Sequence, residues 1–187
     1  MDAGEVTAAL VRARQGDGDA FRALVERHSQ QAFRLAFRMT GNEQDAEDVV
    51  QESFLRAYRE LGRFQARSNF GTWLYRIVAN CSVDLIRSKR SRRVESGTER
   101  FETAPPEDAG PGPERLARSA EIRRRVALAL DELSPLEQAA FRLRHYEGRS
   151  IREIGQTLGL RTSATKNSVF RAVRKLRVAL QVVRGES

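Results

Sequence analysis

Apolar residues recur at steps of three and four positions along almost the whole chain. One series occupies the segment from about residue 42 to 61 and another the segment from about 70 to 90; the second consists of Phe70, Leu74, Ile77, Val78, Cys81 and Leu85. Side chains with this spacing share one face of an α-helix. No segment sustains the alternation expected of a strand. The sequence therefore predicts an all-α protein.

The helical pattern breaks once, in residues 95–115. This stretch contains four prolines and three glycines and has no apolar periodicity, which is typical of a semi-extended, flexible linker. A chain of 187 residues is long enough for two small domains. We therefore expect a first helical domain at 1–94, the linker at 95–115 and a second helical domain at 116–187.

Several classes of protein are excluded by composition. The single cysteine, Cys81, excludes an intramolecular disulfide and a cysteine-based zinc site, and two histidines make a metal cage a poor reading. No apolar run has the length of a membrane span, and the acidic start Met1–Glu5 is unlike a secretory signal. We expect a soluble cytoplasmic protein without cofactor, bound metal or membrane insertion, with Cys81 as a core residue.

The last third of the chain has the pattern of a helix-turn-helix. Ser134 to Glu137 and Ser150 to Glu153 are two capping boxes, and the first has proline at its first helical position. Gly148 separates the two helices, and Gly159 ends the second. A third helix is predicted from Thr162 or Ser163 to about Val183. Its buried stripe is predicted as Val169, Val173, Leu176 and Leu180, and its other face carries Lys166, Asn167, Arg171, Arg174 and Lys175.

The positive charge of the chain is concentrated in this region. Residues 134–187 hold 11 basic and 4 acidic residues, which gives +7 of the net +8. A short helix, a turn with glycine and a basic third helix favour insertion into the major groove of DNA. The alternative is an ordinary three-helix bundle with a solvated basic face.

The segment 41–61 has the opposite character. Five carboxylates stand within ten residues: Glu43, Asp45, Glu47, Asp48 and Glu52. Because such a helix would repel DNA, it is either a solvated acidic face or a docking surface for a protein partner. Metal binding is a third reading, but the loop glycine of a calcium site is absent.

The helix at 70–90 combines an apolar face with a polar one. Thr72, Arg76, Asn80 and Asp84 follow each other at four-residue steps, and a cationic cluster follows them, formed by Arg87, Lys89, Arg90, Arg92 and Arg93. Phosphates held at one end and bases along the stripe would suit nucleic acid. The preceding polar loop, residues 64–69, is a place to hold an unstacked base. A polar helix face is also common without any ligand.

These segments together resemble a known family. DAEDVVQESFLRAY, then FGTWLYRIVANCSVDLIR, a linker and LSPLEQAAFRLRHYEGRSIREIGQTLGL resemble the extracytoplasmic-function (ECF) sigma factors of bacterial RNA polymerase, in the sigma-70 family. The resemblance spans roughly Asp17 to Leu180 apart from the linker. It implies a non-catalytic subunit that binds core RNA polymerase through the β′ clamp helices and the β flap, recognises promoter DNA, and is controlled by an anti-sigma factor.

The resemblance also implies roles for individual residues. The residues matched to core-polymerase binding are Asp45, Glu47, Asp48, Val50, Gln51, Glu52, Phe54 and Leu55. Those matched to the −10 element are Gln65, Arg67, Ser68, Asn69, Arg76, Asn80 and Asp84, with Arg87, Lys89 and Arg90. Those matched to the −35 element are Lys166, Asn167, Ser168, Phe170, Arg171 and Arg174. Trp73 is either a half-buried packing aromatic or a base contact.

Three positions depart from the family pattern. Thr165 stands where a buried valine is usual, Ser168 where arginine is common, and Gly155 where alanine is usual. These departures concern the −35 sequence more than the fold.

Two other functions are compatible with parts of the pattern. A free-standing regulator would share the C-terminal domain, but its N-terminal half would need a ligand pocket or phosphoacceptor site instead of an acidic docking helix. A nucleic-acid enzyme would need clustered metal carboxylates or a nucleophile beside a base, and neither His28 nor His145 has an evident partner motif.

Overall fold

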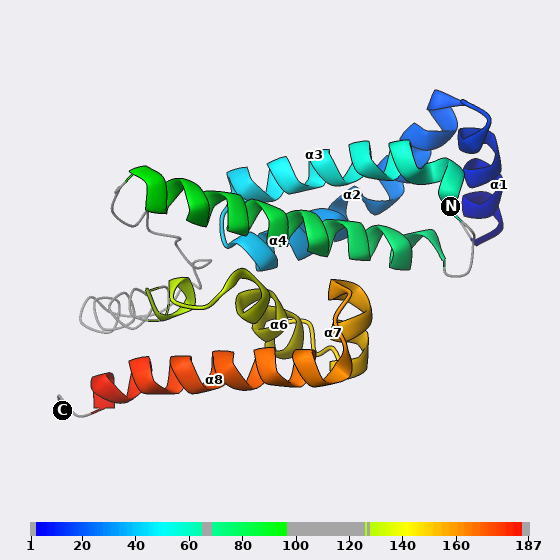
Figure 1. Ribbon diagram of the computed structural model, residues 1–187. Helices are drawn as coiled ribbons and strands as arrows, with labels where there is room; N and C mark the ends of the chain where they lie inside the picture. Colours follow the sequence, from blue (N-terminus) through cyan, green and yellow to red (C-terminus); the bar gives the residue numbers. More distant parts are fainter. Residues whose placement is uncertain (1–2, 65–68, 97–125, 127, 185–187) are drawn as a thin grey trace, which may run out of the picture. The chain divides into compact units, whose positions relative to one another are not determined.

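The computed structural model describes residues 3–64, 69–96, 126 and 128–184 (Figure 1). The regular secondary structure in these ranges is helical, so the prediction of an all-α protein is confirmed. The chain divides into two compact units, Met1–Leu85 and Ile86–Ser187.

The first unit is built from long helices that pack around one core. Its elements are α1 (Ala3–Arg14), α2 (Gly18–Thr40), α3 (Glu43–Glu60), the short 3-10 helix η1 (Leu61–Arg63) and α4 (Phe70–Ser96) (Figure 1). Of α4, the residues up to Leu85 belong to this unit. Leu24 and Met39 of α2 are fully buried, as are Phe70 and Val78 of α4. In α2 and α4, the face that carries the apolar series is therefore buried in the core.

The turn between α2 and α3 fixes the start of the acidic helix. Gly41 adopts a φ of 91°, a left-handed conformation that favours glycine, and ends α2. Asn42 then caps α3, because its side-chain oxygen accepts a hydrogen bond of 2.8 Å from the Asp45 amide. The predicted helix from Asn42 to Leu61 is thus observed within one residue at each end.

α4 is longer than the sequence pattern predicts. It continues beyond Arg90 to Ser96, so residues 95 and 96 of the predicted linker are its last residues. The remainder of the predicted linker, 97–115, lies outside the described residues. The apolar series ends at Leu85, but arginine and lysine are good helix formers and continue the helix without burial.

The second unit contains the predicted helix-turn-helix. Its elements are α6 (Pro135–His145), α7 (Ile151–Leu158) and α8 (Thr162–Arg184). Both capping boxes are present, with reciprocal hydrogen bonds between Ser134 and Glu137 and between Ser150 and Glu153. Gly159 ends α7 with a φ of 66°.

The buried stripe of α8 differs from the predicted one. Among the described side chains of α8, Leu176 is buried as predicted and Thr165 and Ala172 are buried as well, whereas Val169 and Val173 are only half-buried. The side chain of the predicted Leu180 lies outside the described residues. Ala172 takes the buried place predicted for Val173 because α8 packs on α6 and α7. Ala129 and Leu133, ahead of α6, complete this core with Ala172 and Leu176.

Candidate protein and nucleic-acid interfaces

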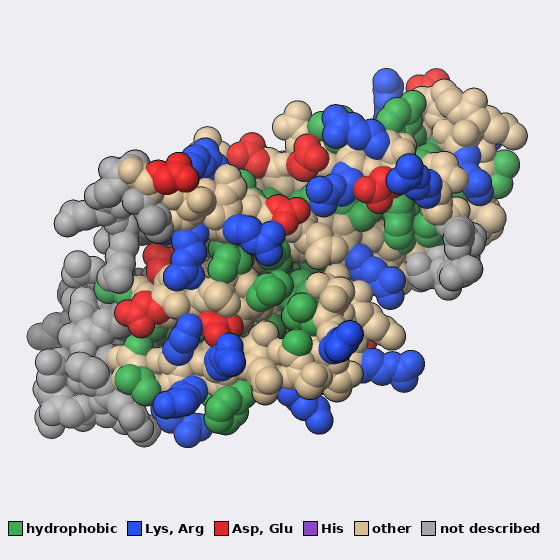
Figure 2. All heavy atoms as spheres, viewed as in Figure 1, with side chains coloured by type: hydrophobic (Ala, Val, Ile, Leu, Met, Phe, Trp, Pro, Cys, Tyr) green, Lys and Arg blue, Asp and Glu red, His purple; other side chains and the backbone are tan. Residues whose placement is uncertain are grey.

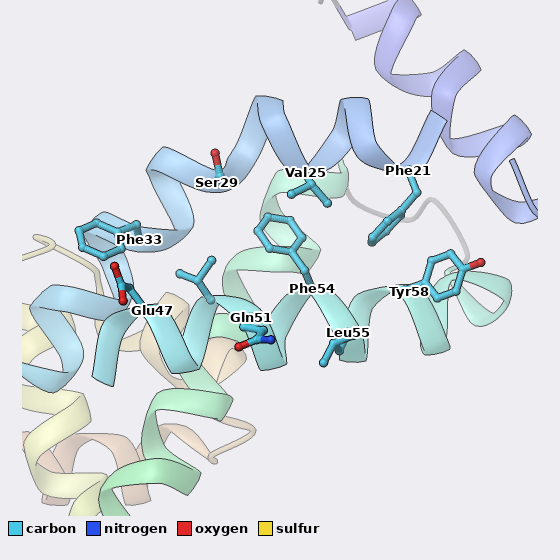
Figure 3. A pocket seen from close by; sticks show the side chains of 10 residues that line it. Phe21, Val25, Ser29, Phe33, Glu47, Gln51, Phe54, Leu55 and Tyr58 are labelled. Carbon is cyan, nitrogen blue, oxygen red and sulfur yellow. The ribbon is translucent and has the colours of Figure 1, made fainter. Parts of the chain in front are cut away.

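An apolar groove runs between α2 and α3. It encloses about 600 Å³, and Figure 3 shows Phe33 and Glu47 at one end and Phe21 and Tyr58 at the other. The rings of Phe21 and Tyr58 meet edge to face with centroids 4.9 Å apart. The groove is lined by Phe21, Val25, Ser29, Phe33, Glu47, Val50, Gln51, Phe54, Leu55 and Tyr58.

The groove leaves large apolar side chains in contact with water. Leu55 is 45% and Tyr58 48% exposed, while Phe54 lies beneath them and is buried. Contiguous apolar surface bordered by charged residues is typical of a site that binds another protein. The groove could receive the apolar face of a helix, which is the mode in which amphipathic helices bind.

Five of the residues matched to polymerase binding line this groove: Glu47, Val50, Gln51, Phe54 and Leu55. Asp48 and Glu52 are exposed on α3. Asp45 has a different place, because it is 7% exposed and its Oδ2 accepts a hydrogen bond of 2.6 Å from Asn42 Nδ2. Asp45 therefore belongs to the cap of α3 and not to its outward face.

The residues that α2 contributes to the groove were missed by the sequence analysis. Phe21, Val25 and Phe33 follow the same periodicity as the core residues beside them, and the pattern alone does not distinguish half-buried from buried positions. The one available signal is their number, since α2 carries more large apolar side chains than a single buried stripe needs.

The start of α4 lies beside the predicted base-holding loop. Asn69 caps this helix, with its Oδ1 accepting a hydrogen bond of 2.7 Å from the Thr72 amide. Gln65, Arg67 and Ser68 lie outside the described residues. Along α4, Arg76, Arg87 and Arg90 are exposed, and Asn80 and Lys89 are half-buried.

Asp84 lies at the edge of this polar stripe and faces α3. Its Oδ2 is 3.6 Å from Nη1 of Arg56, so the carboxylate forms an ion pair with the neighbouring helix. Asp84 is thus brought together with a residue of α3 that the sequence analysis did not select.

Trp73 packs within an aromatic cluster. Its ring centroid is 4.9 Å from that of Phe64 and 5.7 Å from that of Phe70, and its side chain is half-buried. These contacts favour the packing interpretation of Trp73 over the base contact.

The outward face of α8 is basic and includes one large aromatic. Lys166, Asn167, Arg171 and Arg174 are exposed, Phe170 is 66% exposed, and Ser168 is half-buried. α8 carries no acidic residue, and blue side chains are spread along it in Figure 2. The helix therefore presents guanidinium, ammonium, amide and aromatic groups together, which are groups that read base edges and hold phosphates.

Lys175 has a structural partner in α6. Its Nζ donates to Oε2 of Glu137 over 2.7 Å, and Glu137 is only 6% exposed. Burial acts to raise the pKa of the Glu137 carboxyl, but hydrogen bonds from Lys175 and the Ser134 backbone and the charges of Lys175 and Arg171 bring the pKa below its usual value. Glu137 therefore stays ionised and ties α8 to the cap of α6.

The parts of the chain described by the structure hold no cluster of three His, Cys, Asp or Glu side chains placed to bind a metal ion. No helix within these same ranges has both the length and the apolar character needed to cross a membrane.

Comparison with known proteins matches both units. Residues 24–92 match the family model for Sigma-70 region 2, and residues 123–176 match that for Sigma-70, region 4. The chain is 36% identical over 154 residues to the ECF RNA polymerase sigma factor SigE of Mycolicibacterium smegmatis, covering 82% of this chain and 59% of that protein. It is 31% identical over 178 residues to the ECF RNA polymerase sigma factor SigW of Bacillus subtilis, covering 92% of this chain and 95% of SigW.

A solved structure supports the same conclusion. The structure of CnrH in complex with the cytosolic domain of CnrY matches with a TM-score of 0.59 and 29% identity, over 97% of this chain and 99% of that one. The chain belongs to the ECF sigma factors of the sigma-70 family. Proteins of this class direct RNA polymerase to promoters and act in the initiation of transcription.

Proposed function

We propose that the α2–α3 groove is the surface through which this sigma factor docks on core RNA polymerase, with the β′ clamp helices as the bound element. The observation that carries this proposal is the exposure of Leu55 and Tyr58 beside the carboxylates of Glu47, Asp48 and Glu52. A helix with an aliphatic stripe and basic flanks matches both the apolar groove and its acidic rim. The carboxylates steer such a partner, and burial of the apolar side chains supplies affinity.

The promoter −10 element is assigned to the start and the polar stripe of α4. Arg76 and Asn80 offer hydrogen-bond donors to bases, and Arg87, Lys89 and Arg90 offer cations to phosphates. In the proposed domain division, residues 1–94 perform these first two tasks, residues 95–115 connect the domains, and residues 116–187 bind the −35 element.

The −35 element is assigned to the outward face of α8. Its exposed residues stand at three- and four-residue spacing, so one face of the helix can enter a major groove. Arg171 and Arg174 suit guanine edges, Asn167 suits adenine, and Phe170 suits the methyl group of thymine. Lys166 and Ser168 are the remaining residues assigned to the −35 element. The polymerase partner proposed for this second unit is the β flap.

We infer that an anti-sigma factor regulates this protein, because two related proteins were solved with a bound partner. CnrH was solved with the cytosolic domain of CnrY, and RpoE of Bartonella quintana was solved with the anti-sigma factor NepR. RpoE is 23% identical to this chain with a TM-score of 0.59, so this comparison supports a common fold only. An anti-sigma factor that covers the surfaces used for polymerase and promoter would hold this protein inactive in the cytoplasm, with no catalytic activity of its own involved.

Core binding is the experiment that tests the groove. Leu55→Asp places a charge among the apolar groove residues, and Val11→Asp makes the same change at a 53% exposed position of α1. We expect Leu55→Asp to weaken binding to core polymerase at least about tenfold, because burying an unpaired carboxylate costs more than 1.4 kcal/mol. Val11→Asp should bind as the wild type does. Equal binding of all three proteins would exclude the groove as the docking surface.

A further inference from the structure

Arg56 lies between the two helices to which polymerase binding and promoter reading are assigned. It follows Leu55 of the groove on α3, and its side chain reaches α4. Its Nη1 is 3.6 Å from Oδ2 of Asp84 and 3.8 Å from Sγ of Cys81. One guanidinium thus contacts a residue of the polar stripe and a residue of the apolar face of α4.

The seam beneath Arg56 consists of small side chains. Ser53 is fully buried and donates to the Val49 carbonyl over 2.6 Å, and Cys81 is 5% exposed. Small side chains make fewer van der Waals contacts across a pair of helices than large ones do. The ion pair at the rim of the seam joins α3 to α4 beside these small side chains.

The thiol in this seam accepts a hydrogen bond from Arg56 as a neutral group. Burial raises the pKa of the Cys81 thiol, although a hydrogen bond with Ser53 and the charge of Arg56 act in the opposite direction. Cys81 therefore stays neutral, and the charges that act on the same thiol are those of Arg56, Glu52 and Asp84. The carboxylate in ion-pair contact with Arg56 is that of Asp84.

Asp84 is a carboxylate in a stripe that is assigned to DNA binding, where a negative charge is unfavourable. An isolated carboxylate repels phosphates, and a cation within 4 Å offsets much of that charge. Asp84 stands one helical turn after Asn80 and three residues before Arg87, so its position on α4 affects both neighbours on the stripe. Its pairing with Arg56 turns it toward α3.

We propose that Arg56 and Asp84 are a positioning pair, which holds the promoter-reading stripe of α4 in a fixed rotation against α3. Asp84 then contributes to promoter recognition through Arg56 and not through a base contact. This inference rests on the proposed assignment of α3 to the polymerase and of α4 to the −10 element.

Charge exchange tests the pair. The variants are Arg56→Glu, Asp84→Arg and the double variant Arg56→Glu/Asp84→Arg, with Arg56→Lys as the conservative change and Arg59→Glu as a matched charge reversal on an exposed position of α3. The readouts are affinity for core polymerase, open-complex formation by the reconstituted holoenzyme on promoter DNA, and thermal unfolding. The pair is half-exposed, with side chains 39% and 52% accessible, so each single variant is expected to fold.

Each single reversal should reduce open-complex formation about threefold or more, a size in keeping with a half-exposed ion pair, while core affinity stays within about twofold. The double variant should recover to within about twofold of the wild type, and Arg56→Lys should retain activity. Arg59→Glu should leave opening unchanged in the holoenzyme.

Three results would overturn the inference. They are a double variant no better than its worse parent, an Asp84→Arg variant with full activity, and a loss of core affinity in Arg56→Glu, which would make Arg56 a polymerase contact. Failure of the proposed function is distinguishable, because then the wild type would not bind core polymerase at all. If the ion pair forms but the proposed function is wrong, the double variant would still recover the thermal stability that each single variant loses.

Discussion

A β-carbon placed on Gly155 would lie 3.0 Å from Oγ1 of Thr165 and 2.8 Å from the carbonyl oxygen of Leu160. Thr165 is fully buried and donates its hydroxyl to the Arg161 carbonyl over 3.1 Å. Two of the three departures from the family pattern, Gly155 and Thr165, therefore lie against each other. Because Gly155 on α7 has no β-carbon, the side chain of Thr165 on α8 can pack directly against the α7 backbone.

Gly155→Ala should destabilise the protein by about 1–2 kcal/mol, since relief of the overlap with a backbone carbonyl costs about 1–3 kcal/mol and alanine recovers up to about 1 kcal/mol of helix propensity. Chemical denaturation measures the difference. Gly18→Ala is the control, because nothing lies within 4 Å of its added β-carbon. An unchanged stability for Gly155→Ala would contradict the close packing of α7 on α8.

The stability of the protein should fall in acid through Glu137. The pKa of this carboxyl is lower in the folded protein than its ordinary value of 4.5, so the folded state favours the ionised form. Its contribution is complete above that ordinary value and is lost as the pH falls through the lowered pKa. Denaturation midpoints between about pH 3 and 7 should show a steeper decline for the wild type than for Glu137→Gln, which retains a side chain suited to the capping box. Parallel profiles would show that Glu137 is not linked to folding.

Arg171→Ala tests base reading by α8. In a panel of −35 variants, we expect a loss of about 1–3 kcal/mol that disappears when one base pair is changed, because a base-edge contact discriminates at a single position. Arg177→Ala is the comparison, since Arg177 is exposed on the same helix about 120° round from Arg171 and more than one turn further along it. It should weaken all sequences alike or not at all. A uniform loss for Arg171→Ala would assign this residue to a phosphate.

The local structure of the second unit followed from its sequence more completely than its packing did. Ser134 and Ser150 predicted the starts of α6 and α7 because a capping box depends on residues within one turn. The partner of Lys175 is 38 positions away in α6, and no local rule connects them. For the same reason Val173 was predicted as buried where Ala172 is, although Leu176 was predicted correctly.

The groove of the first unit shows the same limit. Its half on α3 was named through the family resemblance, because the carboxylates alone left a solvated face and a docking surface open. The half on α2 has the same periodicity as the core. Asp45 illustrates the reverse error: it counts among the acidic residues in sequence, but its position three residues after Asn42 places it in a cap. The ion pair of Arg56 with Asp84 depends on how α3 and α4 pack and has no signal in the sequence.

Transcription in a reconstituted system tests the proposed function most directly. Purified core RNA polymerase is combined with this protein and a library of promoter fragments randomised upstream of a fixed transcript. We predict transcripts that depend on the protein and that select two conserved elements at a fixed spacing, with Leu55→Asp abolishing the signal and Val11→Asp retaining it. Binding to DNA without any protein-dependent transcript would contradict action as a sigma factor and would favour a free-standing regulator.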